Sequence, residues 1–230
     1  MPVRLGTNTG CSGPNSGGRD PFHGADCFGG AGSSLDLADA PDDEFLPLDG
    51  PVFCTGSLTA VARGLDAHHP VSEVVWMGGA VSVGGNMTAA AEFNAWMDPA
   101  AADRVLRSGT PVRMIPLDVT TRFSWTAVDI EALRCAGRVG AILAHALDFL
   151  VNRDGVFIPH DAVAALALTK PDLFTWRARS VRCETAGLLT MGETVVDRRP
   201  QAVAGPVAVA EEADVAEVSA QIVEAIGRLG

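Results

Sequence analysis

Short runs of apolar residues that do not alternate with polar ones constrain the fold of this chain more than any other feature. Three such runs occupy residues 52–54, 74–77 and 112–117, and the segments between them place apolar residues at helical spacing. Strands that are apolar on both faces are typical of a parallel sheet covered by helices on both sides. The pattern therefore predicts an α/β fold, in which a Rossmann-type parallel sheet is flanked by helices.

The rest of the chain extends this alternation of strands and helices. Asp98 and Pro99 mark a helix start, with the aspartate as N-cap and the proline at the first helical position. The predicted elements are helices over 99–108, 125–136, 139–152 and 160–169, two or three edge strands within 175–197, a final strand over 203–209 and an amphipathic helix over 214–229. We expect a single domain over 1–230, loop-rich in 1–50 and regular α/β in 51–230.

Composition excludes several classes of protein. The 28 acidic and 17 basic side chains leave a formal charge of −11, which argues against nucleic-acid binding because phosphate backbones are repelled. No apolar run approaches the roughly 18 residues of a membrane span, and no apolar segment follows Met1 as in a signal peptide. The five cysteines form no CxxC pair and indicate reduced thiols, so we expect a cytoplasmic protein with no membrane partner.

The segment over 77–99, MGGAVSVGGNMTAAAEFNAWMDP, carries the most chemistry in the chain. Asn86, Glu92 and Asn94 supply two carboxamides and one carboxylate within nine residues. That set suits neighbouring hydroxyl groups, because carboxamides both donate and accept while a carboxylate accepts. The alternative is a glycine-rich surface loop in which these side chains only cap turns.

The same segment resembles the central motif of the inosine–uridine type nucleoside hydrolases. The resemblance continues in chain order through HGAD at 23–26, GSLT at 56–59, PLDVT at 116–120, HD at 160–161 and VRCETAGLLTMGETVVD at 181–197. It implies hydrolysis of the N-glycosidic bond of ribonucleosides to ribose and free base, within purine and pyrimidine nucleoside metabolism. The implied ligand is a small nucleoside.

The resemblance also implies roles for individual residues. Asn86, Glu92 and Asn94 are expected to hold the ribose hydroxyls. His160 is expected near the leaving base as the general acid, and histidine suits proton transfer near neutral pH. His23 is expected close to the nucleobase.

A calcium ion is the cofactor that the resemblance implies. Asp161 is expected to bind it through the carboxylate, and Thr59 through its main-chain carbonyl. The family's N-terminal DxDxxxDD cluster, which supplies most of the calcium carboxylates, has no match behind an apolar strand in this sequence. We therefore expect a chain that lacks the first strand and helix of the fold and holds an incomplete calcium site.

Several alternatives follow from that missing cluster. The sequence could be truncated by a late start site, or be one part of a split enzyme whose partner chain supplies the aspartates. It could also be a non-catalytic relative that binds nucleosides or ribose without hydrolysis. A further alternative is a metabolite-binding α/β protein that is only structurally similar. The resemblance suggests homodimers or homotetramers, whereas composition says nothing about oligomeric state.

Overall fold

The computed structural model describes residues 49–199, 201, 203 and 205–229. The predictions for residues 1–48, including the base-proximal role of His23, lie outside this range. The strands are β1 (Gly50–Cys54), β2 (Val71–Met77), β3 (Val112–Ile115), β4 (Phe174–Arg179), β5 (Val181–Cys183), β6 (Thr194–Val196) and β7 (Val207–Ala213). The helices are α1 (Thr59–Asp66), α2 (Phe93–Met97), α3 (Pro99–Leu106), α4 (Leu117–Thr120), α5 (Ala127–Arg134), α6 (Arg138–Asp154), α7 (His160–Thr169), α8 (Val215–Gly227) and a 3-10 turn, η1 (Pro171–Leu173).

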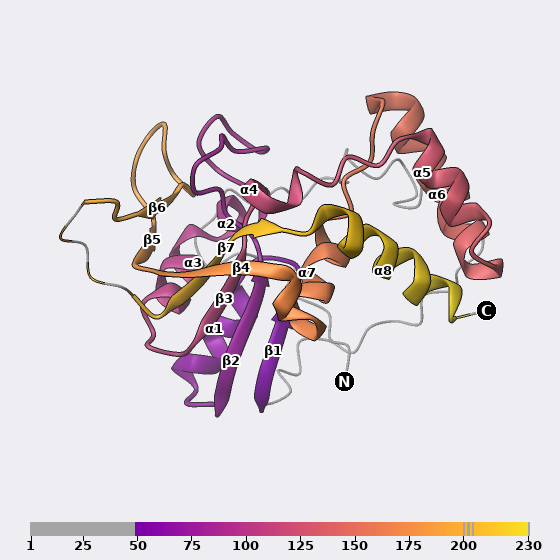
Figure 1. The fold of residues 1–230 in the computed structure, drawn as a ribbon. Helices are drawn as coiled ribbons and strands as arrows, with labels where there is room; N and C mark the ends of the chain where they lie inside the picture. Colours follow the sequence, from indigo (N-terminus) through magenta and orange to yellow (C-terminus); the bar gives the residue numbers. More distant parts are fainter. Residues whose placement is uncertain (1–48, 200, 202, 204, 230) are drawn as a thin grey trace, which may run out of the picture.

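The main sheet confirms the predicted α/β class. Its strand order is β1-β2-β3-β7-β4, in which the first four strands run parallel and β4 runs antiparallel at the edge (Figure 1). Because β1, β2 and β3 are parallel, the loops that follow them emerge at one end of the sheet. The segments rich in polar residues therefore gather at that end.

Burial on both faces explains why the strand sequences do not alternate. Val74 and Trp76 of β2 are buried in an apolar cluster that includes residues of α1 and α3. Val75 and Met77 of the same strand are buried in a second cluster that includes residues of α7 and α8. Successive side chains of a strand point to opposite faces, so β2 needs apolar residues at consecutive positions.

The predicted helix starts are confirmed where a capping aspartate was identified. The Asp98 carboxylate accepts a hydrogen bond from the Ala101 amide at 3.0 Å, and Pro99 is the first residue of α3. Residues 160–169 form α7, and α8 covers most of the predicted 214–229 helix. In the described part of the chain, no helix is long and apolar enough to cross a membrane.

Three strand predictions need correction. The third apolar run ends as a strand at Ile115, because the residues after Pro116 turn into the short helix α4. The final strand begins at Val207, not at residue 203, because Pro206 cannot donate a ladder hydrogen bond. Of the strands predicted within 175–197, only β4 joins the main sheet, whereas β5 and β6 form a separate two-stranded sheet.

Candidate functional site

Asn94 links the ends of two neighbouring strands. Its side-chain Nδ2 donates to the carbonyl of Met77, the last residue of β2, at 3.0 Å and to the carbonyl of Thr55, just after β1, at 3.2 Å. Because both neighbours are carbonyl oxygens, the atom between them must be the amide nitrogen. The Oδ1 oxygen thus faces away from these two carbonyls and is left as an acceptor.

Glu92 is almost fully buried, with 2% of its surface exposed. Its carboxylate accepts hydrogen bonds from the backbone amides of Gly79 at 2.8 Å, Asn94 at 2.9 Å and Ala95 at 3.1 Å. Burial raises the pKa of Glu92, while the three amide donors oppose that rise by favouring the charged form. The carboxylate therefore caps α2 and ties it to the loop that follows β2.

Asn86 is exposed and lies on the loop before α2. Its Oδ1 accepts from the Phe93 amide at 2.9 Å, which leaves the side-chain Nδ2 as a donor. Asn86 and Glu92 therefore do cap local backbone amides, as the alternative interpretation of the 77–99 segment predicts. The same local bonds hold the two side chains in fixed positions, so turn capping and ligand binding are compatible here.

His160 lies at the start of α7 and contacts α4. Its Nδ1 is 2.7 Å from the hydroxyl of Thr120, which is fully buried. Burial lowers the pKa of His160 to about 4, so the ring is neutral at pH 7. Thr120 was not singled out from the sequence as a partner. Its signal in the sequence was its place as the last residue of the PLDVT motif at 116–120.

Asp161, in the first turn of α7, interacts electrostatically with Glu92 of the 77–99 segment. It is exposed, and its negative charge contributes to raising the pKa of Glu92, for which burial is the larger cause. It has the same effect on the Cys54 thiol at the end of β1, whose pKa is raised to about 11, mainly by burial. The carboxylates of Asp161 and Glu92 are therefore close enough to interact electrostatically.

Thr59 is buried as the first residue of α1. Its hydroxyl donates to the Asp98 carboxylate at 2.7 Å and lies 3.1 Å from the Ser57 hydroxyl. The bond between Thr59 and Asp98 joins the start of α1 to the start of α3, where Asp98 is fully buried. The predicted metal ligand is the main-chain carbonyl of Thr59, which the hydroxyl bond leaves unchanged.

The donor set in the described part of the chain is too small to hold a calcium ion by itself. Calcium takes about six to eight oxygen ligands, usually with several carboxylates. Over the described residues, no group of three or more His, Cys, Asp or Glu side chains is arranged to hold a metal. Asp161 and the Thr59 carbonyl would supply two ligands, fewer than a calcium ion takes.

Comparison with known proteins gives a consistent result. Residues 1–220 match the model of the family described as inosine-uridine preferring nucleoside hydrolase. The chain is 38% identical over 194 residues to the pyrimidine-specific ribonucleoside hydrolase RihA of Salmonella typhimurium, an alignment that covers 72% of this chain and 62% of RihA. The chain thus spans less than two thirds of the length of this curated relative.

Two solved structures show the same similarity. The purine-preferring ribonucleoside hydrolase from Gardnerella vaginalis superposes with a TM-score of 0.71 at 30% identity, covering 78% of this chain and 60% of that protein. The plant nucleoside hydrolase PpNRh1 superposes with a TM-score of 0.79 at 25% identity, covering 90% of this chain and 74% of that protein.

Proposed function

The chain belongs to the inosine-uridine preferring nucleoside hydrolase family, and from this premise we propose that it carries the ribose-binding part of a ribonucleoside hydrolase site. The proposed reaction is hydrolysis of the N-glycosidic bond of a ribonucleoside, which releases ribose and the free base. Because the chain spans 62% of the length of RihA, this activity is proposed for the protein and not transferred from its relatives.

The observation that carries the proposal is the fixed orientation of Asn94. Two carbonyls at the ends of β1 and β2 hold its Nδ2, so the Oδ1 acceptor is presented without side-chain reorganisation. Asn86 presents a carboxamide donor from the adjacent loop. One acceptor and one donor on neighbouring rigid segments suit two adjacent ribose hydroxyls, each of which can donate and accept.

Negative charge beside the sugar is the second part of the proposal. Cleavage of a ribosyl–base bond develops positive oxocarbenium character on the sugar. The carboxylates of Glu92 and Asp161 act on each other electrostatically across this region, and a positive charge between them lowers their mutual repulsion. We infer that the transition state gains more from these carboxylates than the neutral nucleoside does.

His160 is proposed to act on the side of the leaving base. Its ring is neutral at pH 7 because burial lowers its pKa to about 4. It therefore acts first as a hydrogen-bond donor to the base, and it transfers a proton only as negative charge develops there. The bond between Nδ1 and Thr120 fixes the ring, which positions the opposite nitrogen for that role.

Members of this family use a metal ion. We propose Asp161 and the Thr59 carbonyl as the contribution of the described residues to such a site. Calcium is the proposed ion because both donors are oxygen atoms.

The test is turnover and binding with defined substrates. The chain is incubated with inosine, uridine and p-nitrophenyl riboside in the presence of calcium, and released ribose or p-nitrophenol is measured. Asn86→Ala is expected to weaken turnover or nucleoside binding by about 10-fold, as loss of one ligand hydrogen bond predicts. Asn152→Ala, an exposed asparagine on α6, is the matched control and should leave both unchanged.

The outcomes separate the proposed functions. Ribose release that Asn86→Ala lowers and Asn152→Ala does not supports the hydrolase. Nucleoside binding without any turnover eliminates hydrolysis by this chain and supports the non-catalytic binding protein. Binding that is equal in both variants contradicts the assignment of the ribose site.

A further inference from the structure

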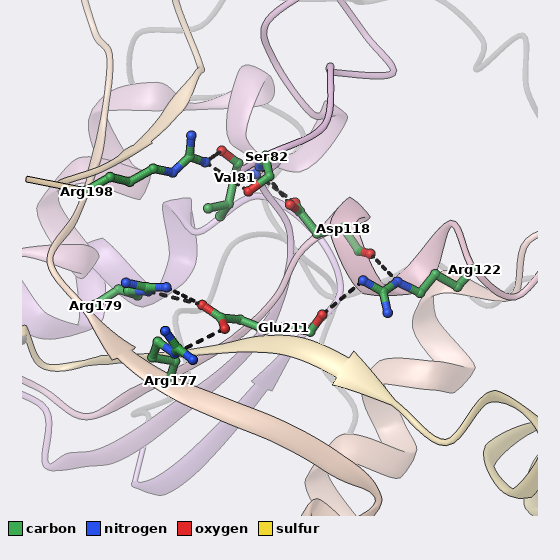
Figure 2. Close-up of polar contacts among 8 residues, drawn as sticks. All are labelled: Val81, Ser82, Asp118, Arg122, Arg177, Arg179, Arg198 and Glu211. Carbon is green, nitrogen blue, oxygen red and sulfur yellow. Dashed lines mark hydrogen bonds and ion pairs between the residues drawn. The ribbon is translucent and has the colours of Figure 1, made fainter.

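An arginine-lined pocket lies beside the loop that leads to the proposed ribose site. It has a volume of about 410 Å³ and is bounded by the loop after β2, by α4 and by strands β4 and β7. Figure 2 shows the side chains of Arg122, Arg179 and Arg198 approaching it from different elements. We refer to it as the arginine pocket. None of the residues assigned above to nucleoside or metal binding lines it.

Arg122 faces the arginine pocket without a carboxylate partner among the described residues. Its Nε donates to the main-chain carbonyl of Asp118 at 3.0 Å, and one terminal nitrogen donates to the main-chain carbonyl of Glu211 at 3.2 Å. Both acceptors are uncharged, so the exposed guanidinium is held in place without an ion pair in the described part of the chain. The N–H groups of the other terminal nitrogen of Arg122 remain available to donate to a ligand.

Arg198 is held in the same manner. One of its terminal nitrogens donates to the carbonyl of Val81 and, at 2.9 Å, to the hydroxyl of Ser82. These acceptors are again uncharged. Two guanidinium groups therefore line the same pocket with carbonyl and hydroxyl partners in the described part of the chain, and an anion would complete both.

Two of the three carboxylates that line the arginine pocket have partners other than Arg122 and Arg198. Both oxygens of Asp118 accept backbone amides, from Val81 and Ser82, at 2.7 Å each. The Glu211 carboxylate pairs with Arg177 at 3.1 Å and with Arg179 at 2.5 Å (Figure 2).

Glu212 is exposed and is the third acidic residue of the lining. Three arginines and three carboxylates thus line the arginine pocket, and two of the arginines, Arg122 and Arg198, form no ion pair with those carboxylates.

We propose that the arginine pocket binds a small phosphate-bearing anion, either inorganic phosphate or a phosphomonoester. The planar guanidinium presents paired N–H donors that match phosphate oxygens, and two such groups from different elements converge here. The pocket volume lies within the roughly 300–1,000 Å³ typical of small-molecule sites, so there is room for the organic part of an ester. This site is separate from the proposed ribose site, although Val81 and Ser82 lie on the loop that leads to Asn86.

The test measures binding of two probes to the 230-residue chain. Inorganic phosphate and ribose 5-phosphate are titrated by calorimetry at constant ionic strength, without nucleoside. Arg198→Gln and Arg122→Gln are each expected to weaken binding by at least about 10-fold. Arg228→Gln removes an exposed arginine of α8 and is the matched control, for which no change is expected. Tighter binding of ribose 5-phosphate than of phosphate identifies an ester as the ligand, and the reverse order identifies the free ion.

A gain-of-affinity variant keeps the test decisive if the arginine variants unfold. Glu212→Gln removes the exposed carboxylate of the lining and should tighten binding several-fold, an effect that unfolding cannot produce. Absence of binding in the wild-type chain, or equal binding in the arginine variants and in Arg228→Gln, overturns the proposal. Neither readout depends on nucleoside hydrolysis, so the arginine pocket and the proposed function can fail independently.

Discussion

At the scale of single residues, burial decides what His160 can do. The resemblance to the nucleoside hydrolases implies that His160 is a general acid, and histidine suits proton transfer near neutral pH. In the structure Nδ1 of the ring lies 2.7 Å from the hydroxyl of Thr120, and burial lowers the pKa of His160 to about 4. The residue type could be read from the chain, but its protonation state depends on packing that only the folded protein has.

The pKa of His160 leads to a prediction about acid stability. The folded-state pKa of about 4 lies below the value of about 6.5 expected for an unfolded chain. The unfolded state binds more protons between these values, so stability is fully present above about pH 6.5 and falls as the pH drops toward 4. The His160 contribution to this loss is expected to be about 3 kcal/mol at most.

The measurement compares wild type with His160→Gln. Denaturant unfolding between pH 4 and pH 7 should show a steeper loss in the wild type, and NMR of the ring nitrogens should show a neutral imidazole down to about pH 5. Equal pH slopes in the two proteins would contradict the assignment.

Thr59 allows a second prediction at the residue scale. Thr59→Val keeps the shape of the side chain but removes the hydroxyl that donates to the buried Asp98 carboxylate. We expect a loss of about 1–3 kcal/mol in the free energy of unfolding, since a buried acceptor loses a donor. Thr185→Val, at an exposed position, should change stability by less than about 0.5 kcal/mol. Urea denaturation of both variants measures the change. Equal losses in the free energy of unfolding would show that the hydrogen bond from Thr59 to Asp98 does not stabilise the fold.

At the scale of elements, the turn after β2 depends on a glycine. Gly79 has φ 80°, and its amide donates to Glu92. A Cβ at this position would come within 2.3 Å of the Met114 side chain and 2.8 Å of the Thr194 hydroxyl. The turn therefore requires both the left-handed conformation and the missing side chain, so that Met114 of β3 and Thr194 of β6 can pack against it.

This geometry predicts a difference between two matched substitutions. Gly109→Ala has a similar φ of 84° with no atom within 4 Å of the new Cβ, so it should lose only the roughly 1–2 kcal/mol of left-handed strain. Gly79→Ala should lose a further 1–3 kcal/mol or so from steric overlap. Thermal and urea unfolding of the pair gives the comparison, and similar losses would mean that the packing around Gly79 adjusts freely.

At the scale of the whole molecule, the position of each strand in the sheet sets its local stability. β2 is hydrogen-bonded between β1 and β3, whereas β1 is the outermost strand of the sheet over the described residues. Amide exchange reports the free energy of the opening that exposes each amide. The two strands should therefore differ in protection.

Hydrogen exchange monitored by NMR or mass spectrometry tests this expectation. The amides of Val74, Val75 and Met114 should exchange only through global unfolding, since these residues are buried at the centre of the sheet. The amides of Val52 and Phe53 should exchange faster, through local opening of β1. Equal protection of β1 and β2 would show that the outer edge of β1 is covered in solution.

Much of the fold was readable from the chain because its signals are local. Apolar runs marked β1, β2 and β3, and the pair Asp98–Pro99 marked the start of α3. The boundary of β7 and the separate β5–β6 sheet were not readable, because both depend on which segments meet. The pairing of Asp103 on α3 with Arg182 and with the Cys183 amide, which anchors β5, joins segments about eighty residues apart and left no signal in the chain.

The sequence by itself determined the α/β class, the order of the elements and the family. It could do so because periodicity, caps and motifs involve residues a few positions apart. Only the tertiary structure decided that Asn94 is held by carbonyls of two strands, that His160 is neutral and that Arg122 and Arg198 share one pocket. Those properties arise from burial and from contacts between distant segments, and both exist only once the chain has packed.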